Sequence, residues 1–333
     1  MIIKNEEVFS LNYIPKTLHG REKEISTISF AMNDFFKRGR GGIGIIEGPS
    51  GAGKTAVMRS LLEASNRAFS IVNCSFEYTP SAVITSISDQ YKIVQARRGK
   101  AFDEQFSFFV SNVGVKKLMI AFDEADNLWA RNKDAPLIIY NFARLHEIKP
   151  ISSFIFLISN DKAFTARLSD KLRSMVSFSL EFEPYKPDVL RKIIKDRAMI
   201  GLRSYDESAV DKCVGYAAKT GDARMGISLL YRAAVIAENK GKERLDIESV
   251  DEAKEELKKS IDEKKLTGLT DIQLKIFEEI KRNEGITSGE LYKAVGISER
   301  TMRENISVLE EKRLIRAEYK MGREGRTRCF YTF

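Results

Sequence analysis

A phosphate-binding loop is the clearest chemical signal in the sequence. The run GPSGAGKT fits the pattern G-x-x-x-x-G-K-[ST]. Glycines in this pattern let backbone N–H groups close on phosphates, while the lysine contacts phosphate oxygens and the hydroxyl residue contacts Mg²⁺. The alternative is a glycine-rich turn that binds nothing, so the flanking elements must decide. The residues assigned to the phosphates are Gly48, Pro49, Ser50, Gly51, Ala52, Gly53, Lys54 and Thr55.

Two adjacent carboxylates follow a later apolar run. The segment LMIAFDEAD at 118–126 places Asp123 and Glu124 where a buried strand is expected to end. Asp123 is predicted to hold Mg²⁺ together with Thr55, and Glu124 is predicted to orient or deprotonate the attacking water. A solvated strand end is the alternative, but the complete phosphate loop favours the catalytic interpretation. Asp126 is expected to be a helix cap or a surface acid.

An amide follows the next apolar run, FIFLISND at 154–161. The side chain of Asn160 emerges where the sheet edge faces the nucleotide, so it is predicted to polarise the attacking water or to contact the terminal phosphate. A turn residue that satisfies its own backbone is the alternative.

The elements around these residues predict a parallel sheet. IGIIE at 43–47 reads as a buried strand that enters the glycine loop, and KTAVMRSLLEAS at 54–65 reads as the helix that leaves it. The helix N-terminus adds its dipole to the anion site. Short apolar runs alternate with helical stretches up to Phe182, which is typical of a parallel sheet covered on both faces. Further strands are expected at 69–73, 118–126, 154–161 and 178–182.

Length and composition are those of an ordinary globular protein. The chain has 333 residues, of which 43% are hydrophobic and 31% charged, so it has room for two or three domains. No stretch has the apolar length of a membrane span, and the start lacks the plan of a signal peptide, so we expect a cytoplasmic protein with no membrane partner. The 3 cysteines are expected to be reduced and in packing positions, and with 2 histidines they offer no zinc-ligand spacing.

A helical region follows the motif EPYKP at 183–187. Four segments show apolar residues three and four apart, which predicts a small α-helical lid. The charged run KKSIDEKKL at 258–266 then predicts a solvated helix end or a linker. The four helical segments are 188–200, 207–220, 223–240 and 247–260.

The last segment has the plan of a winged helix-turn-helix. Amphipathic helices are predicted at 270–283, 287–296 and 298–315, the third capped by Ser298. Two β-like stretches then form a hairpin across MGREGRT, within a segment that holds five Lys and Arg against two Glu.

The third helix and the hairpin are predicted to contact duplex DNA. Met302, Ile306 and Leu309 form the buried stripe, which turns the polar side chains outward. Arginine can read guanine and asparagine can read adenine in the major groove, whereas hairpin cations suit phosphates or the minor groove. Protein contact alone is the alternative use of this domain. The DNA candidates are Arg300, Thr301, Arg303, Asn305, Lys320, Arg323, Arg326 and Arg328.

The order of these motifs resembles the archaeal origin-recognition and helicase-loading family of AAA+ ATPases. The phosphate loop, FDEAD, SND, a later GDAR at the start of a lid helix and a terminal winged helix follow one another as in that family. YIPKTLHGREKEI at 13–25, VNC at 72–74 and FEPY at 182–185 extend the resemblance to nearly the whole chain. It implies a core that binds ATP or ADP with Mg²⁺.

The resemblance also implies roles for single residues. Asn160 corresponds to the first sensor and Arg224 to the second, whose charge would distinguish ATP from ADP and draw the lid onto the core. Arg173 stands where the family places an arginine finger for a neighbouring subunit's ATP. Solvated surface positions are the alternative for both arginines, and packing is the alternative for the tyrosine of the nucleotide pocket. The expected pocket residues are His19, Arg21 and Tyr185.

The predicted architecture is an α/β AAA+ P-loop core with a parallel sheet and an α-helical lid, plus a C-terminal winged helix-turn-helix domain. The expected domains are the core at 1–183, the lid at 184–262 and the winged helix at 263–333. Residues 77–117 show no clear sign of the DNA-contacting insertion of initiators. The basic cluster ARRGK at 96–100 could take its place, although a solvated loop is the simpler interpretation.

The expected function is that of a slow, switch-like ATPase that acts as a replication initiator. It would bind origin duplex DNA and help to recruit or load the replicative helicase, with paralogous initiator subunits as further partners, and it would be associated with the nucleoid. The alternative is a nucleotide-locked DNA-binding regulator with little ATP turnover, plasmid-borne or a divergent paralogue. A clamp-loader-like motor fits the core but not the terminal winged helix.

Overall fold

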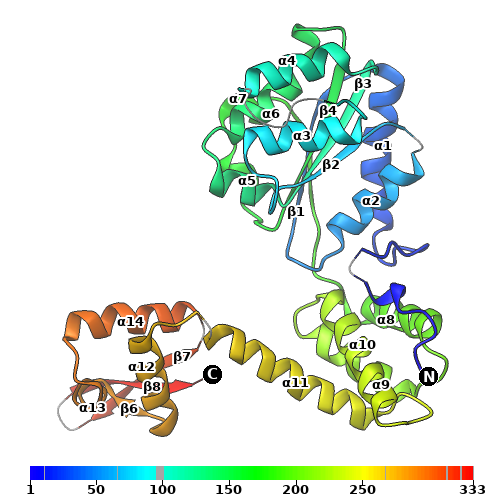
Figure 1. The fold of residues 1–333 in the computed structure, drawn as a ribbon. Coiled ribbons are helices and arrows are strands. Elements are labelled where there is room, and N and C mark those ends of the chain that lie inside the picture. The colour runs from blue at the N-terminus through cyan, green and yellow to red at the C-terminus, as the bar shows by residue number, and fades with distance from the viewer. Residues whose placement is uncertain are drawn as a thin grey trace. The chain divides into compact units, whose positions relative to one another are not determined.

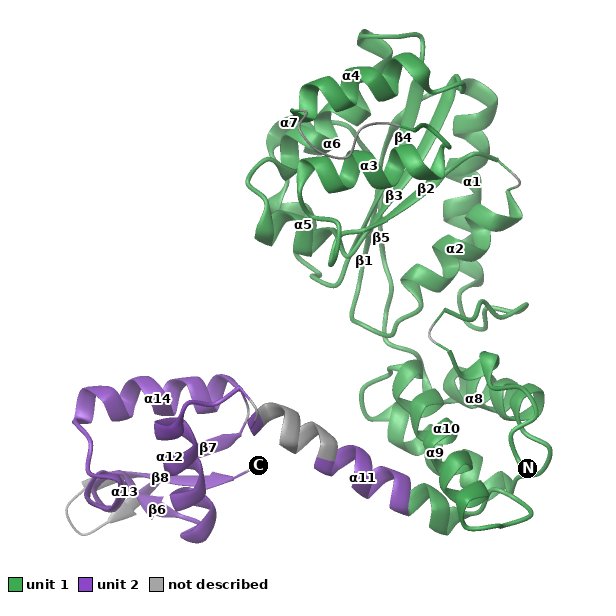
Figure 2. Ribbon diagram, viewed as in Figure 1, with its two compact units in different colours: residues 1–251 green, residues 252–333 purple. Residues whose placement is uncertain are grey.

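The chain folds into two compact units, Met1–Asp251 and Glu252–Phe333 (Figure 1, Figure 2). The cluster ARRGK and Arg323 lie outside the described residues, as does the side chain of Arg326. Within the described parts of the chain, no helix is both long and apolar enough to cross a bilayer. The computed structural model describes residues 1–10, 12–65, 67–94, 101–266, 268–312, 314–322 and 325–332, with side chains described there except at 260–265, 321–322 and 325–326.

A parallel five-stranded sheet forms the centre of the first unit, in the order β2-β3-β4-β1-β5. The predicted strands are confirmed. Because all strands run the same way, their carboxyl ends share one edge, which we call the carboxyl edge, and their amino ends share the opposite one, the amino edge. The strands are β1 Gly42–Glu47, β2 Ser70–Asn73, β3 Lys117–Asp123, β4 Ser152–Ser159 and β5 Val176–Glu181.

Helices cover both faces of this sheet (Figure 1). One face buries the apolar sides of α1 (Glu22–Arg38) and α2 (Lys54–Ala64). The other face carries the remaining core helices around the ring of Phe142. Successive strand residues point to opposite faces, which explains why whole strands are apolar. The helices of the second face are α3 Pro80–Gln90, α4 Phe102–Asn112, α5 Ala125–Arg131, α6 Ala135–Ala143 and the short α7 Asp170–Arg173.

The lid consists of the helices that the sequence predicted. Its three complete helices are α8 (Pro187–Gly201), α9 (Glu207–Ala218) and α10 (Ala223–Asn239). A fourth, α11 (Ile247–Leu266), continues through the charged run at 258–266, so that this run is helix. The helix crosses the boundary between the two units at residue 252.

The N-terminal segment packs on the lid, whereas the sequence placed it in the core. Val8 and Phe9, in the 3-10 helix η1 (Glu7–Phe9), are buried against α8 and α10. The guanidinium of Arg197 donates a 2.6 Å hydrogen bond to the carbonyl of Val8. Ile3 bridges to Leu202 at the end of α8. The apolar side chains of this segment therefore complete the lid's core, and the segment itself runs beside the lid helices in Figure 1.

The second unit has the predicted winged-helix plan. Its core lies around Ile276, Leu291, Met302 and Phe330. Side-chain caps start its helices, with capping boxes at Thr270 and Thr287. A three-stranded antiparallel sheet in the order β6-β8-β7 completes it. The elements are α12 Asp271–Arg282, β6 Ile286–Thr287, α13 Ser288–Val295, α14 Glu299–Glu311, β7 Ile315–Gly322 and β8 Gly325–Thr332.

Candidate functional site

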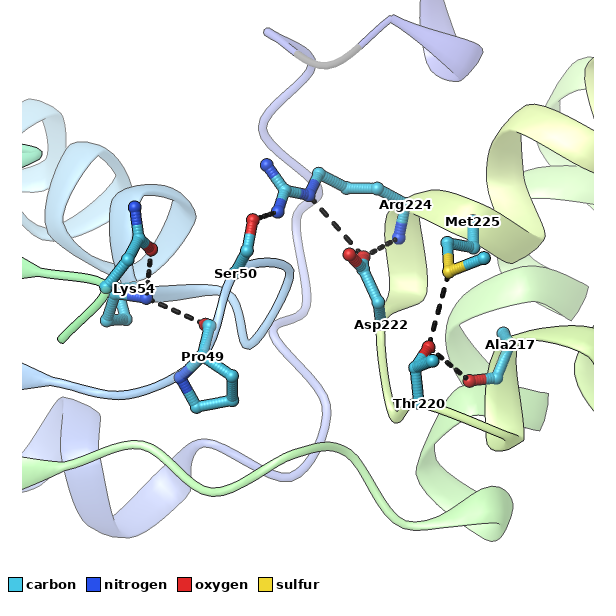
Figure 3. A network of polar contacts seen from close by, with 9 residues as sticks. Pro49, Ser50, Lys54, Ala217, Thr220, Asp222, Arg224 and Met225 are labelled. Carbon is cyan, nitrogen blue, oxygen red and sulfur yellow. Dashed lines mark hydrogen bonds and ion pairs between the residues drawn. The ribbon is translucent and has the colours of Figure 1, made fainter. Parts of the chain in front are cut away.

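The phosphate loop connects β1 to α2, as the motif requires. Lys54 is buried, and its ammonium donates hydrogen bonds of 2.8 Å to the carbonyls of Gly48 and Pro49 and of 3.0 Å to Oδ1 of Asn160. Figure 3 shows the contact with Pro49. Burial lowers the pKa of Lys54 to about 8, an effect opposed by the charge of Asp123. An anion in this loop would restore the favourable environment of the ammonium.

Two glycines of the loop have no space for a side chain. Gly51 has a φ of +77°, and a Cβ there would meet the carboxylate of Asp222 in the lid. Gly53 has a φ of +87°, and a Cβ would come within 2.2 Å of the Tyr185 hydroxyl. Both positions require glycine for the left-handed conformation and for the close approach of neighbouring side chains. The phosphate loop is thus in close contact with Asp222 of the lid and with Tyr185, which lies between the core and the lid.

The residues proposed for Mg²⁺ lie together. The hydroxyl of Thr55 donates a 3.1 Å hydrogen bond to Oδ1 of Asp123 at the end of β3. Burial raises the pKa of the Asp123 carboxyl, and the bond from Thr55 opposes this rise. A hydroxyl and a carboxylate oxygen are suitable donors for Mg²⁺, so the pair fits the ion beside a bound triphosphate.

Glu124 is held by two residues that the sequence analysis missed. Its backbone is left-handed, with a φ of 55°. Its carboxylate accepts hydrogen bonds from the Ser75 hydroxyl and, at 3.4 Å, from the Asn127 amide, which also donates to Ser75 at 2.9 Å. Ser75 follows β2 at the carboxyl edge of the sheet. Its position after a predicted strand was the sequence signal that could have identified it. In this arrangement the carboxylate of Glu124, the proposed general base, already accepts hydrogen bonds from Ser75 and Asn127.

We predict that Ser75→Ala raises the ATPase rate of the isolated chain about tenfold. The substitution removes a hydrogen bond to a charged group, worth roughly 1.5 kcal/mol, that competes with the attacking water. Steady-state phosphate release measures the effect. The double variant Ser75→Ala/Glu124→Gln should show no such rise, and an unchanged rate in the single variant would mean that Ser75 does not restrain Glu124.

Asn160 lies beside the phosphate loop, where the sequence placed it. Its side chain accepts from Lys54, and its backbone N–H donates a 3.1 Å hydrogen bond to Oδ1 of Asp126. The prediction that Asp126 is a helix cap or surface acid is wrong, because Asp126 anchors the backbone of Asn160 and is only partly exposed. The contact was not visible in the sequence because the two residues come from different strand ends.

Arg224 connects the lid to the phosphate loop. Its guanidinium donates a hydrogen bond to the Ser50 hydroxyl, and its backbone N–H donates at 2.8 Å to Asp222, the N-cap of α10 (Figure 3). The side chain is 44% exposed, so a ligand can still reach it. The lid arginine and the loop that holds the phosphates are therefore in direct contact.

The third winged-helix helix turns its polar side chains outward. The predicted stripe of Met302, Ile306 and Leu309 is buried. Arg300 and Arg303 are exposed but pair with Glu304 at 3.1 Å and Glu299 at 3.2 Å. The helix holds two Arg against four Glu, so it has no excess positive charge of its own.

The remaining polar candidates of this helix have local partners. The Asn305 amide donates a 2.7 Å hydrogen bond to the carbonyl of Thr301. The Thr301 hydroxyl lies 2.8 Å from that of Ser298. The Asn305 carbonyl oxygen and the Thr301 hydroxyl retain capacity for a base edge.

Two described hairpin cations, Arg328 and Lys320, also have partners. One guanidinium nitrogen of Arg328 donates to both carboxylate oxygens of Glu310, at 2.5 and 2.7 Å. The Arg328 side chain is only partly exposed. Lys320 lies over the Tyr331 ring, 5.3 Å from its centroid, and remains exposed. Lys320 therefore suits the predicted phosphate contact better than Arg328 does.

Comparison with known families gives one answer along the chain. The family models that match are "AAA ATPase domain" at residues 17–157, "Cdc6 AAA+ ATPase-type lid domain" at 191–255 and "Winged helix-turn-helix DNA-binding" at 269–316. The chain is similar to the ORC1/Cdc6-type AAA+ ATPases in its core, its lid and its winged helix.

Relatives of the ORC1/Cdc6 type match along most of the chain. An ORC1-type DNA replication protein 2 of Methanosarcina mazei is 29% identical over 307 residues, covering 88% of this chain and 82% of the relative. An ORC1-type DNA replication protein of Desulfurococcus amylolyticus is 29% identical and covers 98% and 90%. The structure of the Aeropyrum pernix ORC1 protein in complex with DNA shares the fold, with a TM-score of 0.77 at 24% identity, covering 99% and 94%.

Of the pocket residues that the ORC1/Cdc6 resemblance implied, Arg21 and Tyr185 lie together behind the phosphate loop. Arg21 is buried and donates to the carbonyls of Ala52, at 3.0 Å, and Glu183, at 2.6 Å. Its guanidinium lies 4.0 Å from the centroid of the Tyr185 ring. Both side chains therefore support the loop, and for Tyr185 this agrees with the packing alternative. His19 pairs with Asp196 of α8 at 2.7 Å.

Arg173, the finger candidate, ends α7. Its guanidinium donates to the carbonyls of Ala166 and Leu168, and it forms a 3.3 Å ion pair with Asp170. It is 49% exposed. In the single chain Arg173 closes the preceding turn, and it is exposed enough for contact with a second subunit.

Proposed function

We propose that this protein is an ATP-dependent replication initiator that binds origin duplex DNA and helps to recruit or load the replicative helicase. The observation that carries the proposal is the contact of Arg224 with Ser50, through which the lid touches the loop that binds nucleotide. A winged helix follows in the same chain. Relatives named as ORC1-type DNA replication proteins, and the DNA complex of the Aeropyrum pernix ORC1 protein, support it.

The nucleotide site supports slow, switch-like turnover. Lys54 would hold the β- and γ-phosphates, and Thr55 with Asp123 would hold Mg²⁺, which supplies charge neutralisation when bound. Glu124 would take the proton of the attacking water, and Asn160 would orient it. The hydrogen bonds from Ser75 and Asn127 to Glu124 favour a low basal rate. The same contacts are what would favour the alternative of a nucleotide-locked regulator.

For the lid, we predict that Arg224→Ala leaves nucleotide bound but removes most of the difference between the ATP and ADP forms. A sensor acts by binding one state better, so its loss should shrink the ratio of the two affinities several-fold while ADP affinity stays within about twofold. Nucleotide titrations and small-angle scattering of both forms measure this. Lys219→Ala, an exposed lid position, is the control. If the difference in affinity between ATP and ADP is unchanged, Arg224 is a surface residue and not a sensor.

For DNA, we predict two separable kinds of contact in residues 266–333. Arg300→Ala or Asn305→Ala should cost about 1–3 kcal/mol at particular base pairs and relax the preference there. Arg323→Gln or Arg326→Gln should weaken binding to every sequence and lower the salt slope by about one per lost phosphate contact. Binding to duplex libraries at several salt concentrations separates the two. Identical behaviour of both variant classes would indicate a protein-docking domain instead.

Footprinting on the source replicon with and without ATP tests the whole proposal. An initiator should protect discrete origin sites, change its footprint with nucleotide and retain the replicative helicase on that DNA. A regulator should protect the same sites in either state and retain no helicase. If the full chain binds no duplex at low salt, neither assignment stands.

A further inference from the structure

A row of cations lies along the amino edge of the sheet, opposite to the phosphate loop. Three cations precede β1, one precedes β2, two open β3 and one precedes β4. Because β3 runs from one edge of the sheet to the other, its length separates this row from the carboxyl edge by about 20 Å. We call these residues the amino-edge cations: Lys37, Arg38, Arg40, Arg67, Lys116, Lys117 and Lys149.

The sheet register brings these four segments together. Lys117 stands opposite Ser152, and Gly42 stands opposite Phe154, which puts the residues before β1, β3 and β4 in one row. The ammonium of Lys117 donates to the carbonyl of Phe36, whose ring lies 4.2 Å from the guanidinium of Arg67. Because β2, β3, β4 and β1 are adjacent, the row spans about 14 Å.

The amino edge has little negative charge of its own. No acidic residue occurs in 37–41, 67–69, 113–117 or 148–151. The nearby Asp34 pairs with Arg38 at 2.9 Å, and Glu147 pairs with Arg144. Six of the seven cations are exposed, and within the described parts of the chain no carboxylate forms an ion pair with Lys37, Arg40, Lys116 or Lys149.

Cations on the lid pair with carboxylates. On the lid, Arg191 pairs with Asp211 and Lys195 pairs with Glu207. Cations and carboxylates are nearly equal in number in residues 252–333, so most of the net charge of +8 belongs to residues 1–251. The amino edge is therefore a place where positive charge is both concentrated and free to bind a polyanion.

We propose that the amino edge of the sheet is a second DNA-contact surface, which binds the phosphate backbone of duplex DNA outside the site of the winged helix. The inference rests on the DNA-binding function proposed above. Exposed Lys and Arg side chains in a row about 14 Å long can face several phosphates of one strand, and such contacts need no particular base sequence. The surface supplies affinity and orientation, while the winged helix supplies base recognition.

The composition of this surface favours DNA over an acidic protein partner. Protein interfaces have aromatic and apolar side chains at their centre. In the described segments 37–41, 67–69, 113–117 and 148–151, Ile148 is the one large apolar side chain that is well exposed, at 61%. The remaining exposed groups are cationic or small.

The test neutralises four of the exposed amino-edge cations in the full chain. The variant Lys37→Gln/Arg40→Gln/Lys116→Gln/Lys149→Gln should bind every duplex more weakly and lower the slope of log K against log salt by about 2 to 4. The control Lys192→Gln/Arg203→Gln/Lys219→Gln/Arg232→Gln removes the same charge from exposed lid positions and should keep the wild-type slope. ATP binding and thermal unfolding verify that both variants are folded.

Crosslinking gives a second readout. The native cysteines are all buried, so a photo-crosslinker on Lys149→Cys is selective and should react with DNA, whereas Lys219→Cys should not. A wild-type slope in the quadruple variant together with no crosslink at 149 overturns the proposal. If Arg300→Ala then still weakens site-specific binding, the initiator assignment stands and only the second surface fails. Loss of poly-glutamate binding with unchanged DNA binding would also overturn it, by assigning an acidic protein.

Discussion

Glu124→Gln is expected to bind ATP as the wild type does and to hydrolyse it at least 100-fold more slowly. The amide keeps the size of the carboxylate and can still accept from Ser75, but it cannot take a proton from water. General bases contribute about 10²–10⁴-fold to such reactions. Single-turnover hydrolysis of bound ATP measures the chemical step without product release.

The matched control for this variant is Asp134→Asn, which removes an exposed carboxylate from the loop before α6. It should hydrolyse ATP at the wild-type rate. A wild-type rate in Glu124→Gln would remove Glu124 from the chemistry and leave Asp123 or Asp126 as the acid to test. Because Glu124→Gln should hold ATP for long periods, it is also the variant with which to trap the ATP-bound form on DNA.

Lys54→Ala is expected to weaken ATP binding by roughly 100-fold, or about 3 kcal/mol. The ammonium lies among the carbonyls of the loop, where it would contact phosphate oxygens in the ground state of the bound complex. Removing it therefore lowers affinity and not only rate, in contrast to Glu124→Gln. Calorimetric titration with ATP and Mg²⁺ measures the change, and Lys133→Ala at an exposed site is the control.

The same titration reports the protonation of Lys54. Burial lowers its pKa to about 8 without ligand, and phosphate charge should raise the pKa towards its ordinary value near 10.5. ATP binding should then take up a proton between about pH 8 and 10.5, and affinity should fall as the pH rises through this window. Near pH 7 the lysine is charged in both states and no uptake is expected. Lys54→Ala should show no uptake at any pH, and uptake by that variant would assign the proton to another group.

The elements could be predicted because their signals are local. Each strand of the first unit is a short apolar run, and buried parallel strands need little else. The winged-helix helices directly follow Thr270, Thr287 and Ser298, whose side chains cap the first turn. Such patterns depend on neighbours within a few residues, so the sequence contains them in full.

The contacts that tune the nucleotide site could not be predicted, because they join distant residues. Ser75 and Glu124 are 49 positions apart, and Asn160 and Asp126 are 34 apart. The strand order of the sheet brings each pair together at the carboxyl edge. The hydrophobic periodicity of the sequence does not encode that strand order. The pairs of Arg300 with Glu304 and of Glu299 with Arg303 are different, because a spacing of four on a helix predicts them.

The position of the N-terminal segment imposes an order on biosynthesis. Val8 and Phe9 leave the ribosome long before α8 and α10, which bury them, have been translated. At elongation rates of about 5–20 residues per second, translation from Phe9 to the lid helices takes roughly 10–40 s. The nascent sheet can fold during that interval, whereas the two apolar side chains stay uncovered and open to chaperones or to neighbouring nascent chains. A separately expressed lid that starts at residue 184 would lack these side chains and expose the surface that binds them.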